Sequence, residues 1–530
     1  MASMMPHSKM DAPGLLWDYL NRVADQDPGR IALVHSEGRL DYGTLRQQGL
    51  DLAAGLVALG VKPGDTVSYQ LPNWAETAVI VLAAMRIGAI CNPIIPIYRE
   101  REVRFILTQA RARVVFVPHT YRRFDYVGLV DPIARELGAE LVTCRGPKSG
   151  ARSYDNLLEL GRASSVSLPD ANPDVDTLYL YTSGTEGRPK GVRHSQRTLL
   201  NEARSVIEAT ELIATDPLFM GSPLSHITGF MYASIAGVVL GAKVCLQDIW
   251  NVPAAIDLIE SEGCAWTVGA TPFLQGLLEH PEPERLNSLR VFRCGGADVP
   301  PSLIRKAQAR GIRAMRTYGC SEHPTISGNV ADDPAKAAVT DGRVHRSNRV
   351  RIVDIDDESQ IMAIGMVGEI QSSGPEVFLG YVDATLDQKA FTSDGWLRTG
   401  DLGTLDAQGY VTITGRKKDI IIRKGENISS KEIEDAILEL PMISSCAVIG
   451  VPDAERGEMM VAVCVPRGDA RPGLGDITSH LTSAGFAKQK FPERLELVEV
   501  LPMNAAGKIR KVDLRKTYSG AAGQVEMGEG

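Results

Sequence analysis

Residues 181–192 read Tyr-Thr-Ser-Gly-Thr-Glu-Gly-Arg-Pro-Lys-Gly-Val, which places glycines, hydroxyl side chains and a lysine in one short segment. Residues 177–180 before it have strand-like composition, and Ser195 after it can cap a helix, so we expect a loop between a strand and a helix. The glycines let peptide N–H groups point at an anion. The segment therefore predicts a polyphosphate-binding loop with these candidate contacts: Thr182, Ser183, Gly184, Thr185, Glu186, Gly187 and Lys190.

Two other interpretations of this loop are weaker. A flexible Gly/Ser linker is disfavoured because Pro189 and the flanking elements indicate a shaped turn. A P-loop of the form G-x-x-x-x-G-K-[ST] requires lysine directly after its second glycine, whereas Arg188 and Pro189 intervene here. The segment is therefore typical of a different kind of phosphate loop.

The composition limits the class of protein. With 530 residues the chain exceeds the usual size of one hydrophobic core, so two or more domains are expected. A formal net charge of −8 gives no reason to expect nucleic acid or an anionic membrane as the main partner. The longest apolar run, residues 227–242, is shorter than a membrane span and predicts a buried helix rather than integral membrane association.

The eight cysteines are scattered, without C-x-x-C pairs or a paired Cys/His metal spacing. The N-terminus carries no apolar signal core. We therefore expect reduced thiols in a cytoplasmic protein.

The order of elements predicts an α/β fold. Strand patterns near 67–71, 89–91 and 114–117 alternate with helix patterns over 76–87 and 100–109, as in a parallel sheet covered by helices. Asn73 precedes Glu76 in a spacing like that of a capping box.

Beyond about residue 343 the pattern changes to short alternating strands, at 350–353, 368–371 and 410–413, which indicate a β-rich subdomain. After Gly415 a basic segment precedes a helix over 431–440, with Ser429 and Glu432 in capping-box spacing. Strands near 446–451, 459–465 and 495–500 and a helix near 477–484 complete a small α+β domain. We therefore divide the chain into a large domain, 1–415, and a small domain, 416–530.

Five further segments follow the phosphate loop in order: Pro223–Phe230, Cys294–Ala297, Arg316–Glu322, Thr399–Asp401 and Leu501–Lys508. The ordered set, which spans nearly the whole chain, resembles the adenylate-forming superfamily of acyl-CoA synthetases, firefly luciferases and nonribosomal peptide adenylation domains. The resemblance is greatest to an acyl-CoA synthetase. It implies a large adenylation domain that binds acyl group and ATP, and a small mobile C-terminal domain with its hinge near Lys418.

The resemblance also assigns roles to residues. It implies that Tyr318 stacks on adenine, Ser321 contacts the α-phosphate, Glu322 ligates Mg²⁺ and Asp401 binds the ribose hydroxyls together with Arg416. Lys508 is implied to swing into the active site and, with Thr185 and Mg²⁺, to stabilise charge at the α-phosphorus. The other implied nucleotide contacts are Gly295, Gly296, Ala297, Gly319, Cys320 and Ile413.

The implied acyl pocket contains His226, whose ring lies beside the carboxylate, and also Ile227, Phe230, Thr271, Gly296 and Gly319. Ile227 stands where relatives that activate amino acids keep an aspartate for the substrate ammonium, so an apolar carboxylic acid is expected. Medium-chain, alicyclic, aryl and polycyclic acids all remain open. The implied thiol side contains Lys418, Lys424, Gly425 and Glu426.

The chemistry expected from this resemblance uses ATP, Mg²⁺ and coenzyme A. A carboxylate is a poor electrophile, so ATP converts it to an acyl-AMP, and a thiol then displaces AMP. A carrier-protein thiol in place of CoA, and a catalytically silent acyl- or nucleotide-binding protein, are the alternatives. A homodimer is also open.

Glu186 departs from the family pattern, which usually has a second threonine at this position. Its carboxylate would be repelled by a triphosphate, so we expect it to point away from the phosphates or to pair with Lys190 or Mg²⁺.

The lysine segment yields a testable prediction. Lys508→Ala should reduce adenylation by about 10²- to 10³-fold, because one preorganised charge is removed from the phosphate transition state. Thioester formation from preformed acyl-AMP should largely survive, which separate assays of the two half-reactions would measure. An equal loss in both half-reactions of a folded variant would contradict the assigned role.

Overall fold

The computed structural model describes residues 14–146, 152–182, 189–296, 299–328, 334–423, 426–453, 456–503 and 509–519. The chain divides into two compact units, each described by itself below. Unit 1 comprises Met1–Ala338, Val344–Arg349 and Ser373–Gly395, and unit 2 comprises Val339–Arg343, Val350–Ser372 and Trp396–Gly530.

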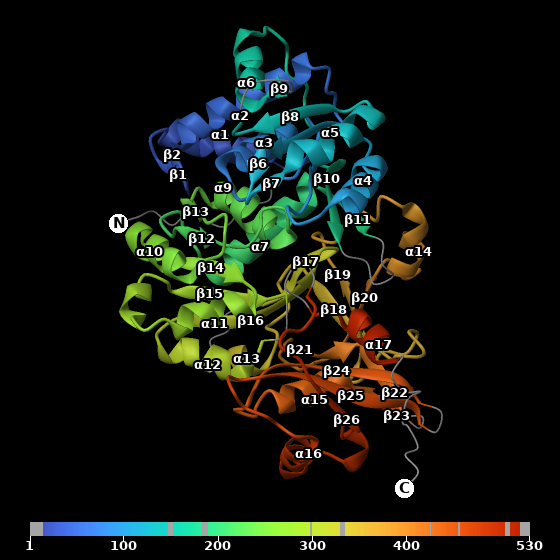
Figure 1. The fold of residues 1–530 in the computed structure, drawn as a ribbon. Helices are drawn as coiled ribbons and strands as arrows, with labels where there is room; N and C mark the ends of the chain where they lie inside the picture. The colour runs from blue at the N-terminus through green and yellow to red at the C-terminus, as the bar shows by residue number, and fades with distance from the viewer. Residues whose placement is uncertain are drawn as a thin grey trace. The chain divides into compact units, whose positions relative to one another are not determined.

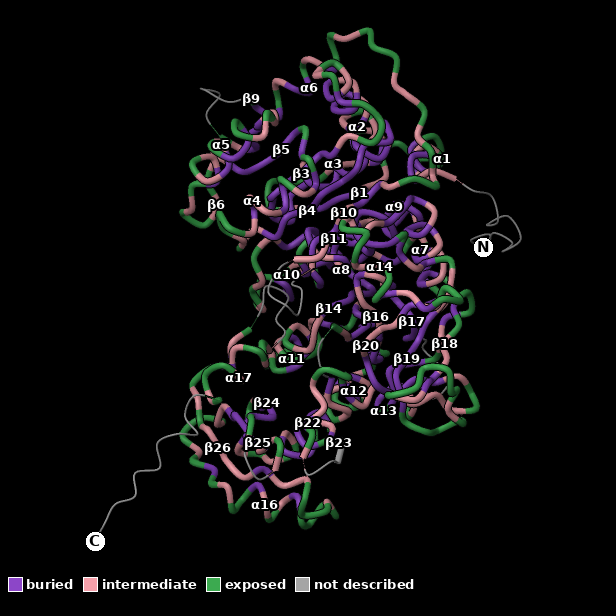
Figure 2. The backbone as a smooth tube through the Cα atoms, turned by 90° about the vertical axis from the view of Figure 1, so that its right-hand side faces the viewer, coloured by how far each residue is buried: buried purple, intermediate pink, exposed green. Residues whose placement is uncertain are grey.

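A seven-stranded sheet in unit 1 is parallel except for β11 at its edge. Its strands, in spatial order, are β11 (Lys190–Ser195), β10 (Asp176–Thr182), β4 (Ile90–Pro93), β3 (Thr66–Tyr69), β5 (Ala112–Pro118), β8 (Glu140–Cys144) and β9 (Arg152–Ser153). Figure 2 shows the central strands of this sheet as buried. The α/β arrangement predicted from residues 67–117 is therefore confirmed.

Helices cover both faces of this sheet, and the alternation of side chains along β5 decides which residue faces which layer (Figure 1). Val115 and Val117 pack with α4 and α5, whereas Val114 and Phe116 belong to the core that contains α3. The helices of this region are α1 (Leu16–Gln26), α2 (Tyr42–Ala58), α3 (Ala75–Arg86), α4 (Glu100–Gln109), α5 (Tyr126–Leu137), α6 (Tyr154–Ala163) and α7 (Gln196–Thr210); β6 (Thr120–Tyr121) and β7 (Phe124–Asp125) form a small hairpin.

An eight-stranded sheet completes unit 1. Its strands, in spatial order, are β17 (His323–Ser327), β16 (Arg313–Cys320), β15 (Val291–Gly295), β14 (Trp266–Gly269), β12 (Leu218–Met220), β13 (Val244–Leu246), β1 (Ile31–His35) and β2 (Gly38–Asp41). The inner strands are parallel, and β17 and β2 are antiparallel to their neighbours. The accompanying helices are α10 (Val252–Glu262), α11 (Thr271–Glu279), α12 (Pro301–Ala309), α13 (Pro334–Val339) and α14 (Asp387–Ala390).

The apolar run 227–242 forms a buried helical segment, as predicted, but its middle is not α-helical. Helix α8 (Ile227–Gly229) leads into a π-helical stretch, Phe230–Ala236, and then into α9 (Gly237–Leu240). π-Helical turns often occur at functional sites because they displace side chains from the regular helical positions.

Unit 2 contains two further sheets. The four-stranded sheet is β18 (Arg349–Val353), β19 (Gly368–Ser373), β20 (Leu397–Leu405) and β21 (Val411–Arg416); the other is β23 (Glu426–Ser429), β22 (Ile420–Arg423), β25 (Gly457–Pro466) and β24 (Ile443–Asp453), with β26 (Arg494–Leu497) beside β25. Helices α15 (Ser430–Ile437) and α16 (Leu474–Ser483) belong to the core on one face of the second sheet, and α17 (Lys511–Ser519) to the core on the other. Ser429 caps α15 by accepting from the N–H of Glu432, as predicted.

Two local predictions are wrong. The segment 183–189 connects two antiparallel strands, because residues 190–195 form β11 before Ser195 caps α7. Asn73 does not cap α3, whose N-cap is Trp74. The Asn73 amide instead donates to the carbonyls of Ser222 and Gln247 and accepts from the N–H of Leu224, which holds the segment before His226 in place.

Helices α2 and α6 approach each other closely because glycines lie at their contact. A Cβ atom on Gly161 would lie 1.7 Å from the Asp51 carbonyl oxygen, and one on Gly55 would lie 2.3 Å from the carbonyl oxygen of Leu157. Both obstructing atoms belong to the backbone, so a side chain at either position would force the helices apart.

Gly161→Ala should therefore lower the free energy of unfolding by about 2 kcal/mol, the usual cost of overpacking. Gly475→Ala in α16 is the matched control, because its Cβ would meet nothing within 4 Å, and it should be neutral or stabilising by up to about 1 kcal/mol. Urea unfolding of both variants measures the difference. Equal stability of the two variants would contradict the packing argument.

Candidate functional site

Four neighbouring parallel strands of unit 1 end at the same edge of the eight-stranded sheet. These are β12, β14, β15 and β16, whose register is fixed by pairs such as Val268 with Arg293 and Gly295 with Thr317. The segments that follow them contain His226, Thr271, Gly296 and Ser321, respectively. Ligands of α/β sheets bind outside the carboxyl ends of the strands, so the topology supports a site built from these predicted residues.

The predicted acyl residues next to His226 belong to the hydrophobic core of unit 1. Ile227 and Phe230 are buried, and His226 is half-buried at the start of α8, where its Nδ1 accepts from the N–H of Thr228 at 3.4 Å. Thr271 Oγ1 lies 4.0 Å from Cys294 Sγ, which brings the end of β15 to the start of α11. Burial raises the pKa of the Cys294 thiol to about 12, so this thiol is neutral.

The predicted glycines are required by packing or by backbone conformation. A Cβ on Gly295 would lie 2.5 Å from the Thr317 carbonyl oxygen, and one on Gly319 would lie 2.0 Å from that of Pro324. Gly296 has φ +80°, in the left-handed region, with no atom near its missing side chain. Ala297 lies outside the described residues.

Glu322 lies in the turn between β16 and β17 and is half-buried. Its Oε1 accepts a hydrogen bond from the Tyr381 hydroxyl at 2.7 Å, and its carbonyl accepts from the N–H of Phe378 at 2.8 Å. Burial, and then the neighbouring carboxylate of Glu322, raise the pKa of Tyr381, so the hydroxyl remains a donor. Tyr318 and Ser321, predicted to contact the nucleotide, are buried on either side of half-buried Cys320.

Only the base of the predicted phosphate loop is described. Thr182 pairs with Lys190 across the antiparallel strands, and Lys190 Nζ lies 5.7 Å from the centre of the Tyr381 ring. Gly191 faces Tyr181, whose ring atom Cζ would lie 2.9 Å from a Cβ. The other predicted contacts, Ser183, Gly184, Thr185, Glu186 and Gly187, lie outside the described residues.

The predicted ribose contacts adjoin each other in unit 2. Asp401 on β20 pairs with Arg416 on β21, and Arg416 Nε lies 3.0 Å from Asp401 Oδ1. Asp401 is buried apart from a small accessible fraction, whereas the arginine side chain is 44 % exposed. The N–H of half-buried Ile413 donates to Asp341 Oδ2 at 2.8 Å.

The predicted hinge lies in a short helical turn, Lys417–Asp419. Partial burial, and then the charge of Arg416, lower the pKa of Lys418. Its neighbours are held by ion pairs, Lys417 with Glu369 at 2.9 Å and Asp419 with Arg515 at 2.8 Å. Lys424, Gly425, Lys508 and the side chain of Glu426 lie outside the described residues.

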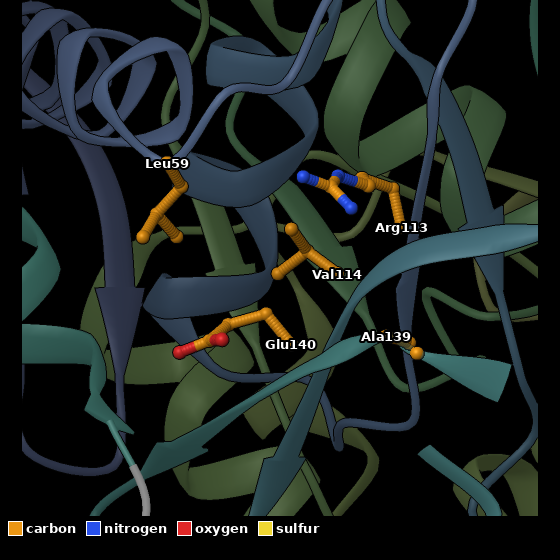
Figure 3. A pocket seen from close by; sticks show the side chains of 6 residues that line it. Leu59, Arg113, Val114, Ala139 and Glu140 are labelled. Atoms are coloured by element: carbon orange, nitrogen blue, oxygen red, sulfur yellow. The ribbon is translucent and has the colours of Figure 1, made fainter. Parts of the chain in front are cut away.

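A cavity of about 110 Å³ lies away from these residues. It is lined by Leu59, Arg113, Val114, Gly138, Ala139 and Glu140, at the start of β5 and β8, as Figure 3 shows. None of the predicted site residues lines it. Among the described residues, no group of three or more His, Cys, Asp or Glu side chains is arranged to hold a metal ion by itself.

Two models of known protein families match the sequence of this chain. The family model for AMP-binding enzymes matches residues 20–382, and the model for their C-terminal domain matches residues 432–508. The chain belongs to the AMP-binding enzyme family.

Relatives within this family act on different acids. The chain is 35 % identical over 515 residues to the medium-chain fatty-acid–CoA ligase of Escherichia coli K12, covering 94 % of this chain and 90 % of the relative. It is 33 % identical over 505 residues to the indoleacetate–CoA ligase of Aromatoleum aromaticum, covering 94 % and 98 % of the two chains. The ATP-bound structure of MatB from Rhodopseudomonas palustris superposes with a TM-score of 0.86 at 28 % identity, over 95 % of this chain and 99 % of the other.

The family assignment confirms the recognition of an AMP-binding, adenylate-forming ligase and the fold class of a large N-terminal and a small C-terminal domain. The division at residue 415 and the roles of single residues stay predictions. Within the described ranges, every helix is too short or too polar to cross a bilayer.

Two contacts of the site were not predicted from the sequence. His194 on β11 is buried, and its Nε2 donates to the Ser321 carbonyl at 2.8 Å, which ties the base of the phosphate loop to the turn before Glu322. The Tyr381 hydroxyl donates to Glu322, which is 59 residues away in the sequence. Both contacts join residues that are far apart in the sequence, so local patterns do not reveal them. A lone histidine in a strand pattern and a tyrosine after a glycine carry no periodic signal.

Burial lowers the pKa of His194 to about 4, against an ordinary value of 6.5. The unfolded chain therefore binds a proton before the folded one, so His194 makes stability fall as pH drops from about 6.5 towards 4. We expect His194 to account for a loss of about 2 kcal/mol between pH 7 and pH 5.

The variant His194→Gln cannot titrate and should show a stability profile flatter by that amount, although it is less stable at pH 7. Buried His345, whose pKa is also lowered, remains in both proteins and cancels in the comparison. Urea unfolding at several pH values measures the slopes. Parallel slopes for wild type and variant would show that folding leaves the pKa of His194 unchanged.

Proposed function

We propose that this protein is an acyl-CoA synthetase that uses ATP to activate an apolar carboxylic acid as acyl-AMP and then transfers the acyl group to CoA. The main support for this proposal is that predicted acyl and nucleotide residues follow four neighbouring parallel strands at one edge of the sheet. The named activities of the relatives support the same conclusion, since the two cited above are CoA ligases.

Adenylation requires the acid carboxylate to attack the α-phosphorus while pyrophosphate leaves. In this proposal, the half-buried His226 ring orients the carboxylate, and Thr182 and Lys190 fix the base of the loop that binds the phosphates. Asp401 and Arg416 of unit 2 are the proposed ribose contacts. Positioning and electrostatic stabilisation supply most of the rate in such a reaction.

Glu322 is the proposed Mg²⁺ ligand. Its carboxylate fits this role because Mg²⁺ is commonly held by one or two carboxylates together with substrate phosphates and water, without a cluster of protein ligands. Bound Mg²⁺ would neutralise phosphate charge in the transition state. Tyr381 donates to Oε1 of Glu322 and so fixes the direction of the carboxylate.

Thioester formation requires a thiol to attack the acyl carbonyl and expel AMP. We propose that rotation near Lys418 brings the segment of Lys424, Gly425 and Glu426 to the thiol side after the lysine segment withdraws. A glycine at position 425 suits a narrow thiol channel, where any side chain would obstruct the passage.

The acid is proposed to be apolar. Ile227 is only 7 % exposed and follows the His226 ring, and Phe230 beside it is fully buried. A substrate ammonium placed beside Ile227 would be buried next to an alkyl side chain, which is costly. Medium-chain, alicyclic, aryl and polycyclic acids fit this argument equally.

The direct test incubates the purified protein with ATP, Mg²⁺ and a panel of carboxylic acids, and measures pyrophosphate release and acyl-CoA by mass spectrometry. We expect acid-dependent pyrophosphate release, and equal amounts of AMP and acyl-CoA once CoA is added. Accumulation of acyl-AMP that CoA does not discharge would indicate a carrier-protein acceptor. Absence of release with every acid would indicate a silent binding protein.

Glu322→Gln isolates the carboxylate charge. The amide oxygen can still accept from Tyr381, so the local structure is kept, while pyrophosphate release should fall about 10²- to 10³-fold. Glu279→Gln, at an exposed position near the C-terminal end of α11, is the control and should retain full activity. Similar rates for the two variants would remove Glu322 from the mechanism.

A further inference from the structure

A segment without regular secondary structure joins the base of the phosphate loop to Glu322. This segment, residues 374–382, is called the clip. Its backbone bonds β11 on one side, through Leu379 N–H to the Arg193 carbonyl at 2.8 Å and Val382 N–H to that of Gly191 at 2.8 Å. On the other side Phe378 N–H and the Tyr381 hydroxyl both donate to Glu322.

The clip begins at a buried carboxylate. Glu376 is fully buried, and its two oxygens accept from different donors: Ser347 Oγ to Oε1 at 2.6 Å, and Asn348 Nδ2 to Oε2 at 2.7 Å. The same Asn348 amide also donates to the Thr325 carbonyl at 3.1 Å. His323 Nε2 lies 3.8 Å from Glu376 Oε2. The carboxylate therefore connects the clip to β17 and to the segment 344–349.

A second buried acid faces this carboxylate. Glu202 on α7 is 1 % exposed, and neither of its carboxyl oxygens has a hydrogen-bond partner among the described residues. Burial, and then the charge of Glu376, raise the pKa of Glu202 well above its ordinary value, whereas His323 and Glu202 lower that of Glu376. Two neighbouring buried carboxyls cannot both be ionised, so Glu202 is the one that keeps the proton.

The surrounding buried groups balance the single negative charge. Arg293 is fully buried and donates to Thr210 Oγ1 at 2.9 Å, Thr317 Oγ1 at 3.2 Å and His345 Nε2 at 3.3 Å. These partners are neutral, because burial and then Arg293 lower the pKa of His345 to about 3. The Arg293 charge lies near enough to Glu202 to oppose the rise in the pKa of that carboxyl.

We propose that Glu376 is a positioning residue for the nucleotide site: the hydrogen bonds that it accepts from Ser347 and Asn348 fix the start of the clip, and the clip sets the Glu322 carboxylate through Phe378 and Tyr381. This inference rests on the proposed function, because it concerns the aim of Glu322 toward the metal–nucleotide complex. Glu376 itself lies in the protein interior and acts only through the clip.

Removing Glu376 should change the position of the clip without unfolding it. Phe378 is buried and stacks on Phe391 with ring centres 5.0 Å apart, and Tyr381 N–H donates to Asp387 Oδ1 at 2.7 Å. These contacts keep the clip folded when Glu376 is changed. The position of Phe378 and Tyr381 relative to Glu322 still depends on where Glu376 holds the start of the clip.

The test compares Glu202→Gln, Glu376→Gln, Tyr381→Phe and the double variant Glu376→Gln/Tyr381→Phe. Calorimetry gives the Kd of ATP with Mg²⁺ and in EDTA, and thermal unfolding checks the fold. Glu202→Gln keeps a neutral side chain of nearly the same shape near Glu376, so affinities should stay within twofold of wild type. In Glu376→Gln an amide N–H meets the donors Ser347 and Asn348, and the Kd of Mg·ATP should rise about tenfold.

Tyr381→Phe should also raise the Kd of Mg·ATP about tenfold, with little change in the Kd measured in EDTA. The Kd of the double variant should lie within twofold of the higher of the two single-variant Kd values, because both changes act through Glu322. Tyr179→Phe is the matched control, since it loses a tyrosine–carboxylate hydrogen bond of 2.9 Å to Asp176, and its Kd should not change. If Glu376→Gln fails to fold, Ser347→Ala removes one of the bonds to Glu376 and should give a smaller rise of the same kind.

Three results would overturn the proposal: a Glu376→Gln variant that loses thermal stability but binds Mg·ATP normally, multiplicative effects in the double variant, or equal harm from Glu202→Gln and Glu376→Gln. These outcomes are separable from failure of the proposed function. A wild-type protein without acid-dependent pyrophosphate release would refute that function, while the binding comparison would still decide the role of Glu376.

Discussion

Parallel strands that end at one edge of a sheet bring their following loops together, and this constraint assembles the candidate site of unit 1. The loops after β12, β14, β15 and β16 span residues 221 to 322 of the sequence, yet the strand order places them side by side. Local contacts then fix the position of each loop. Gly295 and Gly319 allow the backbone to pass within contact of neighbouring carbonyls, and Asn73 holds the segment that leads to His226.

Burial also sets the charge states of several side chains in unit 1. A site for a polyphosphate must accept negative charge, and the carboxylate of Glu322 is directed by a tyrosine hydroxyl rather than neutralised by an ion pair among the contacts the structure describes. Deeper in the core, the pKa of Glu376 is lowered despite its burial, and Ser347 and Asn348 both donate to its carboxylate. His194 and His345 are neutral as well, because burial lowers the pKa of both imidazoles.

Local signals in the sequence were sufficient for much of the fold. The helix expected over 100–109 has those bounds, and Ser195 and Ser429 cap helices because their hydroxyls meet the N–H groups three residues on. The alternation around residues 67–117 predicted the parallel sheet for the same reason: each side chain's neighbours are set by a short repeat. The ordered motifs then predicted the family, which the family models confirm.

Local sequence patterns do not reveal contacts between residues that are far apart in the chain. Residues 190–195 form an edge strand because they pair with β10 and with the clip, and no local pattern distinguished them from the start of a helix. Asn73 has the spacing of a cap, but its amide donates to carbonyls 149 and 174 residues away. The bond from Tyr381 to Glu322 and the acid pair of Glu202 and Glu376 depend on the tertiary fold, since residue types alone do not reveal which side chains share an interior.

The central claim is that the acid becomes an acyl-AMP whose bridging oxygen comes from the carboxylate. The most direct measurement is a single turnover with ATP, CoA and a substrate acid labelled with ¹⁸O in its carboxyl group, followed by mass spectrometry of the nucleotide product. Attack on the α-phosphorus predicts that AMP gains one labelled oxygen for each thioester formed. Label in inorganic phosphate with release of ADP, or AMP without label, would contradict the account.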